Sequence, residues 1–334
     1  MNKRRLFVIP IAMALISMSL MVSSMGVTSL QVQQATGTMG TADSPVAEQS
    51  PVALTLFRTF TGKYGYVTAG VGVRNTGRGT ISLTVPKGTS LAAAYLYWVI
   101  LANTTAGSND NKLVLNGIIT TGSLIGTGPT PCWLPPIGRT YRADVAGLLG
   151  KTEGRYGISY GLEVGGMASY YTDGSDPWTT GLIAYVPAAE SAHLVLIYSD
   201  STMTTNSVIT IYNGYYEQSG GVATFAYAWP ARTTGAAMFS HLTSDGQVLT
   251  PSVFTKSLNL TVGATNRILD QGTFLNGKDP SITSKATYKG SLSDTNTYVV
   301  TSQIPIGGSA STLTYNIASD CIVWSALIFA TGTN

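Results

Sequence analysis

The sequence predicts an all-β protein made of two packed β-sandwich units, with almost no helix after the first 26 residues. Short runs rich in Val, Ile, Tyr and Thr recur along the chain and are separated by Gly, Pro, Asn and Asp. This alternation of strand-forming runs with turn residues is typical of a sandwich. The roughly 300 residues after the N-terminal segment exceed the usual size of one hydrophobic core, so we expect two β units.

Residues 1–26 have the three parts of a secretion signal. Lys3, Arg4 and Arg5 precede an apolar run that extends from Leu6 to about Val22, and small serines follow it. A charged start, an apolar stretch and small residues are the features of a cleaved signal peptide. A retained membrane anchor is the alternative, because about 20 apolar residues span a bilayer. In both cases the rest of the chain faces outward, which predicts an extracellular or cell-surface location.

Residues 27–51 are polar and small without a sustained apolar period, which indicates an extended spacer. An alternative is that the stretch Ser29 to Gly37 adds as a strand to a sheet edge of a neighbouring copy. We expect the first sandwich unit over residues 52–230 and the second over residues 231–334. The interruption WPARTTG near residue 230 marks the division.

The strands are predicted from apolar and β-branched runs bounded by turn residues. The best helical candidate after the signal is one turn near Val145 to Leu149. The predicted strands are Ala53 to Phe60, Tyr66 to Val73, Thr80 to Val85, Leu91 to Ile100, Lys112 to Ile119, Tyr156 to Val164, Gly181 to Val186, His193 to Tyr198, Ser207 to Tyr212, Val222 to Trp229, Thr297 to Gln303 and Cys321 to Ala330.

Two of these runs predict central strands with both faces covered. The run from Ala92 to Val99 is apolar or amphipathic on both faces, and so is the run from His193 to Tyr198. Tyrosines on the second face of Ala92 to Val99 point toward another layer or a ligand surface. We expect the following residues in the core: Ala94, Leu96, Trp98, Leu194, Leu196, Ile209 and Trp324.

The charge balance argues against nucleic acid as a partner. Residues 1–26 hold three of the 19 Lys and Arg residues and none of the 16 acids, so the remainder is neutral. Binding to phosphates needs a basic footprint, which is missing here. With 10% charged residues, the surface must consist largely of hydroxyl and amide groups. Such a surface suits contact with glycans, with other cell-surface proteins or with further copies of the chain, and membrane contact only through an uncleaved N-terminal segment.

The segment AAAYLYWVILANTTAGSNDNKLVLNG, from Ala92 to Gly117, carries a resemblance. It is similar to a domain family of unknown function in secreted and cell-surface, adhesin-like proteins of bacteria and archaea. Three further segments fit the same pattern: Tyr141 to Gly150, Gly181 to Tyr215, and Ser319 to Thr331. The resemblance implies a jelly-roll-like sandwich and transfers no catalytic residues, because its motifs consist of core aromatics and turn glycines. Unlike longer members, this chain has no repeat array and no sortase-type tail.

Cys132 and Cys321 are the two cysteines of the chain, and disulfides persist outside the cell. A bond between them would close a loop of nearly 190 residues and stabilise the fold by up to about 5 kcal/mol. The alternative is a small buried Cys321 and a loop thiol at Cys132.

A serine hydrolase is a weak alternative for this chain. GISYG, from Gly157 to Gly161, matches the Gly-x-Ser-x-Gly elbow, but its surroundings continue as an alternating strand instead of the required strand, turn and helix. His193 begins an apolar strand, where a satisfied core histidine is the simpler interpretation. Glu163 and Asp200 are conceivable carboxylates for glycoside hydrolysis, without a local motif to support them.

Calcium is the one metal for which the sequence offers ligands, and no cofactor is otherwise indicated. Asp173 and Asp176 lie on a predicted loop, TDGSD, as oxygen ligands of calcium do. The alternative is that Asp suits the turn geometry there. A zinc site is disfavoured, because the chain has two histidines and two distant cysteines to serve as ligands.

Aromatic residues provide the candidate ligand surface. Tyrosine and tryptophan rings that flank loops could stack sugars, or they could pack those loops onto the rim of the sandwich. The candidates are Tyr170, Tyr171, Trp178, Tyr212 and Tyr215. We therefore expect an exported, non-enzymatic structural or adhesive protein, with a carbohydrate-binding module as the alternative and a secreted hydrolase on the same scaffold as a more distant one.

Overall fold

The computed structural model describes residues 54–73, 77–102, 110–130, 137–149, 158–165, 188–227, 229–246, 256–271, 274–277 and 293–333. These residues form strands and one short 3-10 helix, which confirms the all-β class. The elements are β1 (Thr55–Gly62), β2 (Tyr64–Gly72), β3 (Gly79–Val85), β4 (Ser90–Ala102), β5 (Lys112–Leu115), β6 (Ile118–Thr121), β7 (Ser123–Pro129), β8 (Ile137–Asp144), η1 (Ala146–Leu148), β9 (Ile158–Gly165), β10 (Ala188–Ser199), β11 (Asn206–Ala226), β12 (Ala237–Ser244), β13 (Ser257–Val262), β14 (Thr265–Gln271), β15 (Ser293–Val299) and β16 (Ala310–Thr333).

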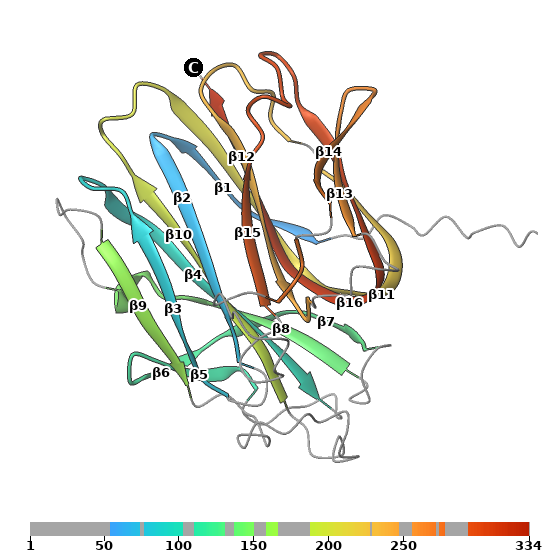
Figure 1. The fold of residues 1–334 in the computed structure, drawn as a ribbon. Coiled ribbons are helices and arrows are strands. Elements are labelled where there is room, and N and C mark those ends of the chain that lie inside the picture. The colour runs from blue at the N-terminus through green and yellow to red at the C-terminus, as the bar shows by residue number, and fades with distance from the viewer. Residues whose placement is uncertain are drawn as a thin grey trace, which may run out of the picture. The chain divides into compact units, whose positions relative to one another are not determined.

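The strands form three sheets (Figure 1). Sheet A has the order β1-β11-β16-β12-β15, and β13 and β14 extend it along the first part of β16. Sheet B has the order β2-β10-β4-β8-β7, and sheet C has the order β3-β9-β5-β6. All pairings are antiparallel between the described strands.

Sheet B lies between the other two sheets because its strands are apolar on both faces. In β4, Ala94, Leu96 and Trp98 join the core shared with sheet C. Tyr95 and Tyr97 point the other way, into the core shared with sheet A. This alternation confirms the prediction of a central strand that is covered on both sides. The seven predicted core residues are all 0% exposed.

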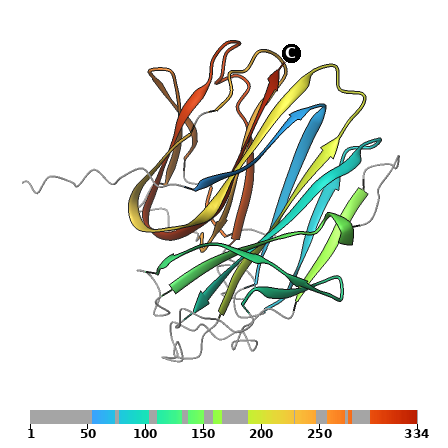
Figure 2. The ribbon, with the colours of Figure 1, turned by 180° about the vertical axis from the view of Figure 1, so that it is seen from behind.

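Sheet A folds back on itself and so forms the second sandwich. β11 has 21 residues and β16 has 24, and both bend in the same region (Figure 2). The bend coincides with register shifts between Asn213 and Tyr216 and again around Gly221. Gly220 and Gly221 have φ angles of 68° and 74°, which a side chain would disfavour. The two halves of sheet A enclose a core rich in aromatic rings.

The predicted division near residue 230 does not separate the sheets. β11 precedes that point and β16 follows it, yet the two are paired along most of their length. Residues 49–334 form one compact unit. In the part of the chain that the structure describes, no helix has the length and apolar character needed to cross a membrane. The predicted signal and spacer lie outside the described residues.

The local turns follow the sequence closely. β5 and β6 are joined by Asn116 and Gly117, whose φ angles are 49° and 81°. Two consecutive residues with positive φ are the requirement of a two-residue hairpin turn, and Asn-Gly meets it best. The expected helical turn near Val145 to Leu149 is η1.

Several strands differ from the prediction. The runs at Ser207 to Tyr212 and Val222 to Trp229 are parts of one bent strand, β11. β7, β8, β12, β13 and β14 were not predicted, and β15 begins four residues before the predicted strand Thr297 to Gln303. The predicted strand Lys112 to Ile119 is wrong, because the turn at Asn116 and Gly117 divides it into β5 and β6. Gly181 to Val186 lies outside the described residues.

Candidate functional site

A seam of hydrogen-bonded polar side chains joins sheets B and A, and it contains His193, one of the two histidines of the chain. His193 on β10 is completely buried. Its Nε2 lies 2.8 Å from the Ser191 hydroxyl, and its Nδ1 lies 2.9 Å from the Thr295 hydroxyl on β15. Ser191 in turn bonds to Ser244 on β12. The imidazole is therefore satisfied on both sides by groups without charge.

His241 on β12 is the second buried imidazole. The amide nitrogen of Asn296 donates to its Nε2 at 3.1 Å, and its Nδ1 faces the Tyr315 hydroxyl at 3.3 Å. Rings of Phe239, Phe274 and Tyr298 lie around it. Burial lowers the pKa of His241 to about 3, and the neighbouring His193 adds to the effect.

Desolvation also lowers the pKa of His193 to about 3. Both imidazoles are therefore neutral at physiological pH, and their hydrogen bonds to the described residues involve no carboxylate. A further contact across the two sheets is the hydrogen bond between Tyr66 on β2 and Ser240 on β12, at 3.0 Å. His193 and the Tyr66–Ser240 pair are buried and cross-link sheets B and A, whereas His241 forms its hydrogen bonds within sheet A.

The hydrolase candidates are not brought together as an elbow. Ser159 lies within β9, which continues without a turn from Ile158 to Gly165 and pairs with β3 in sheet C. His193 lies in the middle of sheet B, between β2 and β4. Asp200 caps the turn after β10, where its carboxylate accepts from the backbone and hydroxyl of Thr202. The side chain of Glu163 lies outside the described part.

Of the predicted ligand-binding rings, the structure describes Tyr212 and Tyr215. Tyr212 stacks on Tyr227 with ring centroids 4.1 Å apart and meets the edge of Phe329. It is half-buried, and it packs the bend of sheet A.

Tyr215 lies at the other side of the bend, against sheet B. A Cβ on Gly138 would lie 2.0 Å from its hydroxyl, and one on Gly126 would lie 2.3 Å from its backbone nitrogen. The hydroxyl donates to Glu217 at 2.6 Å. Burial and this carboxylate raise the pKa of Tyr215 well above its usual value. The two tyrosines thus make packing contacts, and glycines of β7 and β8 provide the space for Tyr215.

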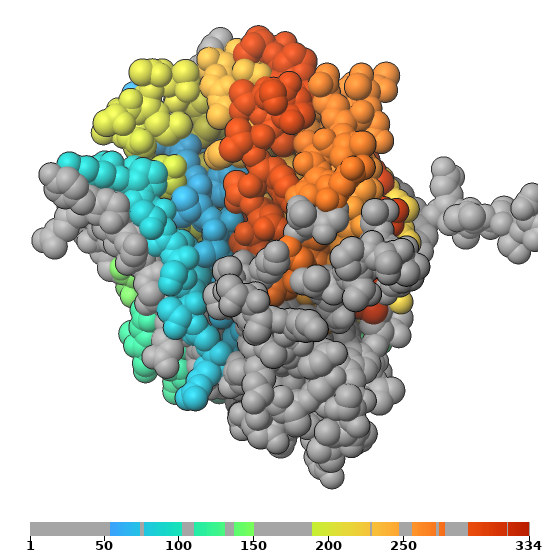
Figure 3. Space-filling view, in the orientation of Figure 1, coloured from blue at the N-terminus to red at the C-terminus, as the bar shows by residue number. Residues whose placement is uncertain are grey.

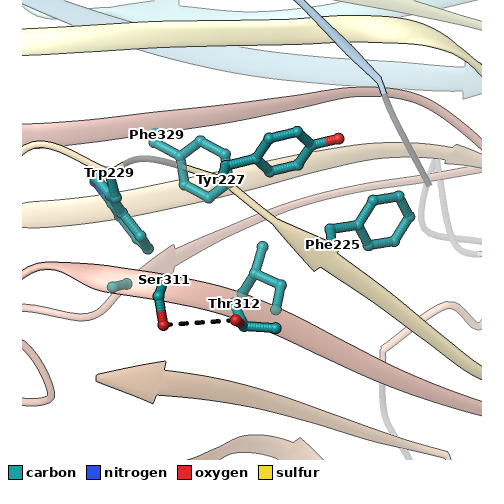
Figure 4. Close-up of a pocket in the computed structure, with 8 residues that line it drawn as sticks. Phe225, Tyr227, Trp229, Ser311, Thr312 and Phe329 are labelled. Carbon is teal, nitrogen blue, oxygen red and sulfur yellow. Dashed lines mark hydrogen bonds between the residues drawn. The ribbon is translucent and has the colours of Figure 1, made fainter. Parts of the chain in front are cut away.

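A small pocket opens beside the aromatic core of sheet A (Figure 4). Phe225, Tyr227, Trp229 and Phe329 form its aromatic wall, and the chain around Ser311 forms the other side. It has room for about one water molecule. The indole nitrogen of Trp229 is buried and has no hydrogen-bond partner among the described residues. A sugar ring would not fit in a pocket of this size.

Two buried ion pairs were not foreseen from the sequence. Arg139 pairs with Asp110 near the start of β8, and Lys256 pairs with Asp320 next to β13. Lys256 also donates to the backbone oxygen of Leu275. Each pair joins segments that are distant in the sequence, so no local motif could have indicated it.

The remaining predicted site residues lie outside the described residues: Tyr170, Tyr171, Trp178, Asp173, Asp176 and Cys132. Cys321 lies half-buried on β16, beside Val99, Leu101 and Val323. Its bond to Cys132 stays a prediction. Within the described ranges, no three His, Cys, Asp or Glu side chains are grouped so that they could hold a metal ion.

Comparisons with known proteins identify no family. No family model and no curated protein matches the chain. Among solved structures, the chain is similar to the major capsid protein P2 of bacteriophage PM2, with 9% identity, a TM-score of 0.22, and coverage of 80% of this chain and 98% of that one. A peptide-N(4)-(N-acetyl-β-D-glucosaminyl)asparagine amidase is similar with 12% identity and a TM-score of 0.24, and the match covers 80% of this chain and 97% of that one. The mavirus major capsid protein is similar with 8% identity and a TM-score of 0.20, and the match covers 92% of this chain and 93% of that one.

These identities and TM-scores are too low for an argument about function. The similarity to the two capsid proteins is distant. The resemblance to adhesin-like surface domains stays a prediction, because no family is identified.

Proposed function

We propose that the chain is an exported structural or adhesive protein of a cell surface, which provides binding area instead of chemistry. The observation that supports this proposal most is the burial of both histidine side chains. A general base needs access to substrate and a pKa near the working pH. His193 is sealed between sheets B and A, His241 is sealed inside the aromatic core of sheet A, and burial lowers the pKa of both to about 3.

The pattern of the strands supports the same proposal. Sheet B and the near half of sheet A are apolar on both faces, so the layers form a continuous packed body. Exposed strand faces carry many hydroxyl groups, as in β3, where Thr80, Ser82 and Thr84 are exposed. Such faces offer many weak hydrogen bonds, which suits adhesion and assembly outside the cell.

The test compares binding and turnover in the same preparation. The purified protein is screened on a glycan array and against ester and glycoside substrates, next to the Trp178→Ala and Ser159→Ala variants. We expect that none of the three proteins turns over a substrate. We also expect that Trp178→Ala does not abolish any glycan signal of the wild-type protein. Turnover that Ser159→Ala removes would overturn the proposal in favour of a hydrolase. Selective glycan binding that Trp178→Ala removes, with folding intact, would favour the carbohydrate-binding module.

A second experiment tests the structural role directly. Cells that lack the protein are compared with the parent strain for adhesion to a surface and for integrity of the envelope. Loss of either property, with restoration by the wild-type chain and equally by the Ser159→Ala variant, is the expected result. Normal adhesion and a normal envelope without the protein would contradict the proposal.

A further inference from the structure

One part of sheet A, formed by β14, β13, β16 and β11 in that order, has an outer face with mainly polar side chains. Register partners make a row across the four strands, which consists of Ile268, Asn259, Thr314 and Thr224. Leu258 and Leu260 point the other way, into the aromatic core. Successive residues of a strand alternate between its faces, so the row lies on the outer face of the sheet.

Asn259, Leu260 and Thr261 on β13 form an acceptor sequence for N-glycosylation. In this sequence an asparagine is followed by any residue except proline and then by serine or threonine. Asn259 and Thr261 are both partly exposed, and Leu260 between them is buried. The acceptor pair therefore shares the outer face of β13. A second such sequence, from Asn103 to Thr105, lies outside the described residues.

The side-chain amide of Asn259 is not used by the fold. It makes no hydrogen bond to another described residue. Asn213, by contrast, donates from this group to the Tyr97 hydroxyl at 3.2 Å. Asn296 donates to the imidazole of His241 at 3.1 Å. A group attached to the Asn259 amide therefore breaks no hydrogen bond between described residues.

Ile268 is an exposed apolar side chain beside Asn259. It lies directly opposite Asn259 on β14, at the edge of the described sheet, and is 61% exposed. Figure 3 shows the orange residues of β13 and β14 at the visible surface. The Cβ atoms of opposed residues in an antiparallel pair are about 5 Å apart. The first sugars of a chain attached to Asn259 would therefore reach over Ile268.

We propose that Asn259 carries an N-linked oligosaccharide whose first sugars cover Ile268. In the transfer, the amide nitrogen Nδ2 attacks the anomeric carbon of an oligosaccharide that is attached to a lipid phosphate. The bond from Nδ2 to this carbon forms, the bond from the carbon to the phosphate oxygen breaks, and the amide loses one proton. The lipid phosphate leaves. The inference rests on the export of the chain in the proposed function, because this acceptor sequence is used in secreted proteins.

Peptide mass spectrometry of the full chain, purified from its native cells, tests the attachment. Trypsin releases residues 257–267 as one peptide, which contains Asn259 and also Asn266, an asparagine outside the acceptor sequence. We expect this peptide to gain the mass of an oligosaccharide. Fragment ions should place the whole gain on Asn259 and none on Asn266.

Four variants expressed in the same cells separate the acceptor sequence from the asparagine itself. Thr261→Ala should abolish the added mass although Asn259 is still present, and Asn259→Gln should abolish it as well. Thr261→Ser keeps the acceptor sequence and should keep the added mass. Asn266→Gln is the control within the same peptide and should change nothing. Thermal unfolding of every variant verifies the fold.

Hydroxyl-radical footprinting tests whether the sugars cover Ile268, because radicals oxidise side chains that solvent reaches. Ile268 should be oxidised in Thr261→Ala, and most of this oxidation should be lost in Thr261→Ser, which keeps the oligosaccharide. Ile306 is the matched control, since it is also 61% exposed. Its oxidation should be the same in both variants.

The outcomes separate this inference from the proposed function. An unmodified peptide 257–267, in a chain that an impermeant reagent labels on intact cells, would overturn the inference and leave the proposed function standing. An unmodified peptide in a chain that is labelled only after lysis would contradict both. A sugar mass that persists in Thr261→Ala and in Asn259→Gln would also overturn the inference, because the sugar is then on another residue. Equal oxidation of Ile268 in Thr261→Ala and Thr261→Ser would refute the cover over Ile268.

Discussion

Lowering the pH should destabilise the fold through the two buried histidines. The unfolded chain binds a proton at each imidazole near the ordinary pKa of 6.5, whereas burial lowers the folded-state pKa of His193 and His241 to about 3. The unfolded state therefore binds more protons as the pH falls below 6.5, and stability is lost progressively down to about pH 3.

The magnitude follows from the pKa difference. At about pH 5 the unfolded histidines are almost fully protonated and the folded ones are not, which costs about 2 kcal/mol per histidine and about 4 kcal/mol for both. Single domains have a total stability of about 5–15 kcal/mol, so the effect is large. Both side chains are 0% exposed, so solvent screening does not reduce it.

The assay is urea unfolding, followed by tryptophan fluorescence at several pH values between about 7.5 and 5. We compare the wild-type protein with His193→Gln, His241→Gln and the double variant. Glutamine does not titrate, so each single variant should lose about half of the pH dependence and the double variant most of it. The comparison uses the slope against pH, so a constant loss of stability in a variant does not affect it. An unchanged slope in the double variant would refute the reasoning.

Three further changes test the packing. Gly126→Ala should cost about 1–3 kcal/mol, because its Cβ would lie 2.3 Å from the backbone nitrogen of Tyr215, as measured by thermal unfolding. Lys256→Met should cost about 3–5 kcal/mol in chemical denaturation, because it removes the ammonium group that neutralises the buried Asp320 carboxylate. Cys321→Ser should lower stability by up to about 5 kcal/mol under oxidising conditions, and by much less in a reducing buffer, if the predicted disulfide forms.

Each of these three has a control. Gly147→Ala should be close to neutral, because nothing lies within 4 Å of the added Cβ. Replacement of Asp320 by Leu together with Lys256→Met should recover most of the loss, since no charge then remains buried. For the disulfide, an identical melting temperature of the wild-type protein with and without reductant would contradict the prediction.

The sequence predicted the centre of the fold well because strand alternation is a local signal. β4 and β10 are apolar on both faces, and a strand with this pattern has to be covered twice. The Asn116-Gly117 turn was not predicted, because the apolar run from Lys112 to Ile119 was interpreted as one strand across it, although two adjacent residues determine the turn. The bend of sheet A was not readable, because it depends on how β11 and β16 pair over a long distance.

The polar seam shows why the site was harder to predict than the core. His193 was expected as a satisfied core residue, and it is one. Its partner Thr295 is 102 residues away, and Ser244 is 53 residues from Ser191. Serine and threonine are common on exposed strands, so nothing local distinguished these from surface hydroxyls. Only the packing of sheet A on sheet B makes them partners.

The most direct test of the account is whether the protein is displayed outside the cell. Intact cells are treated with a membrane-impermeant amine-reactive biotin reagent, and labelling of the protein is compared with labelling in lysed cells. The account predicts equal labelling in both, since exposed lysines such as Lys87 and Lys112 would be accessible. Labelling only after lysis would contradict the proposed surface role.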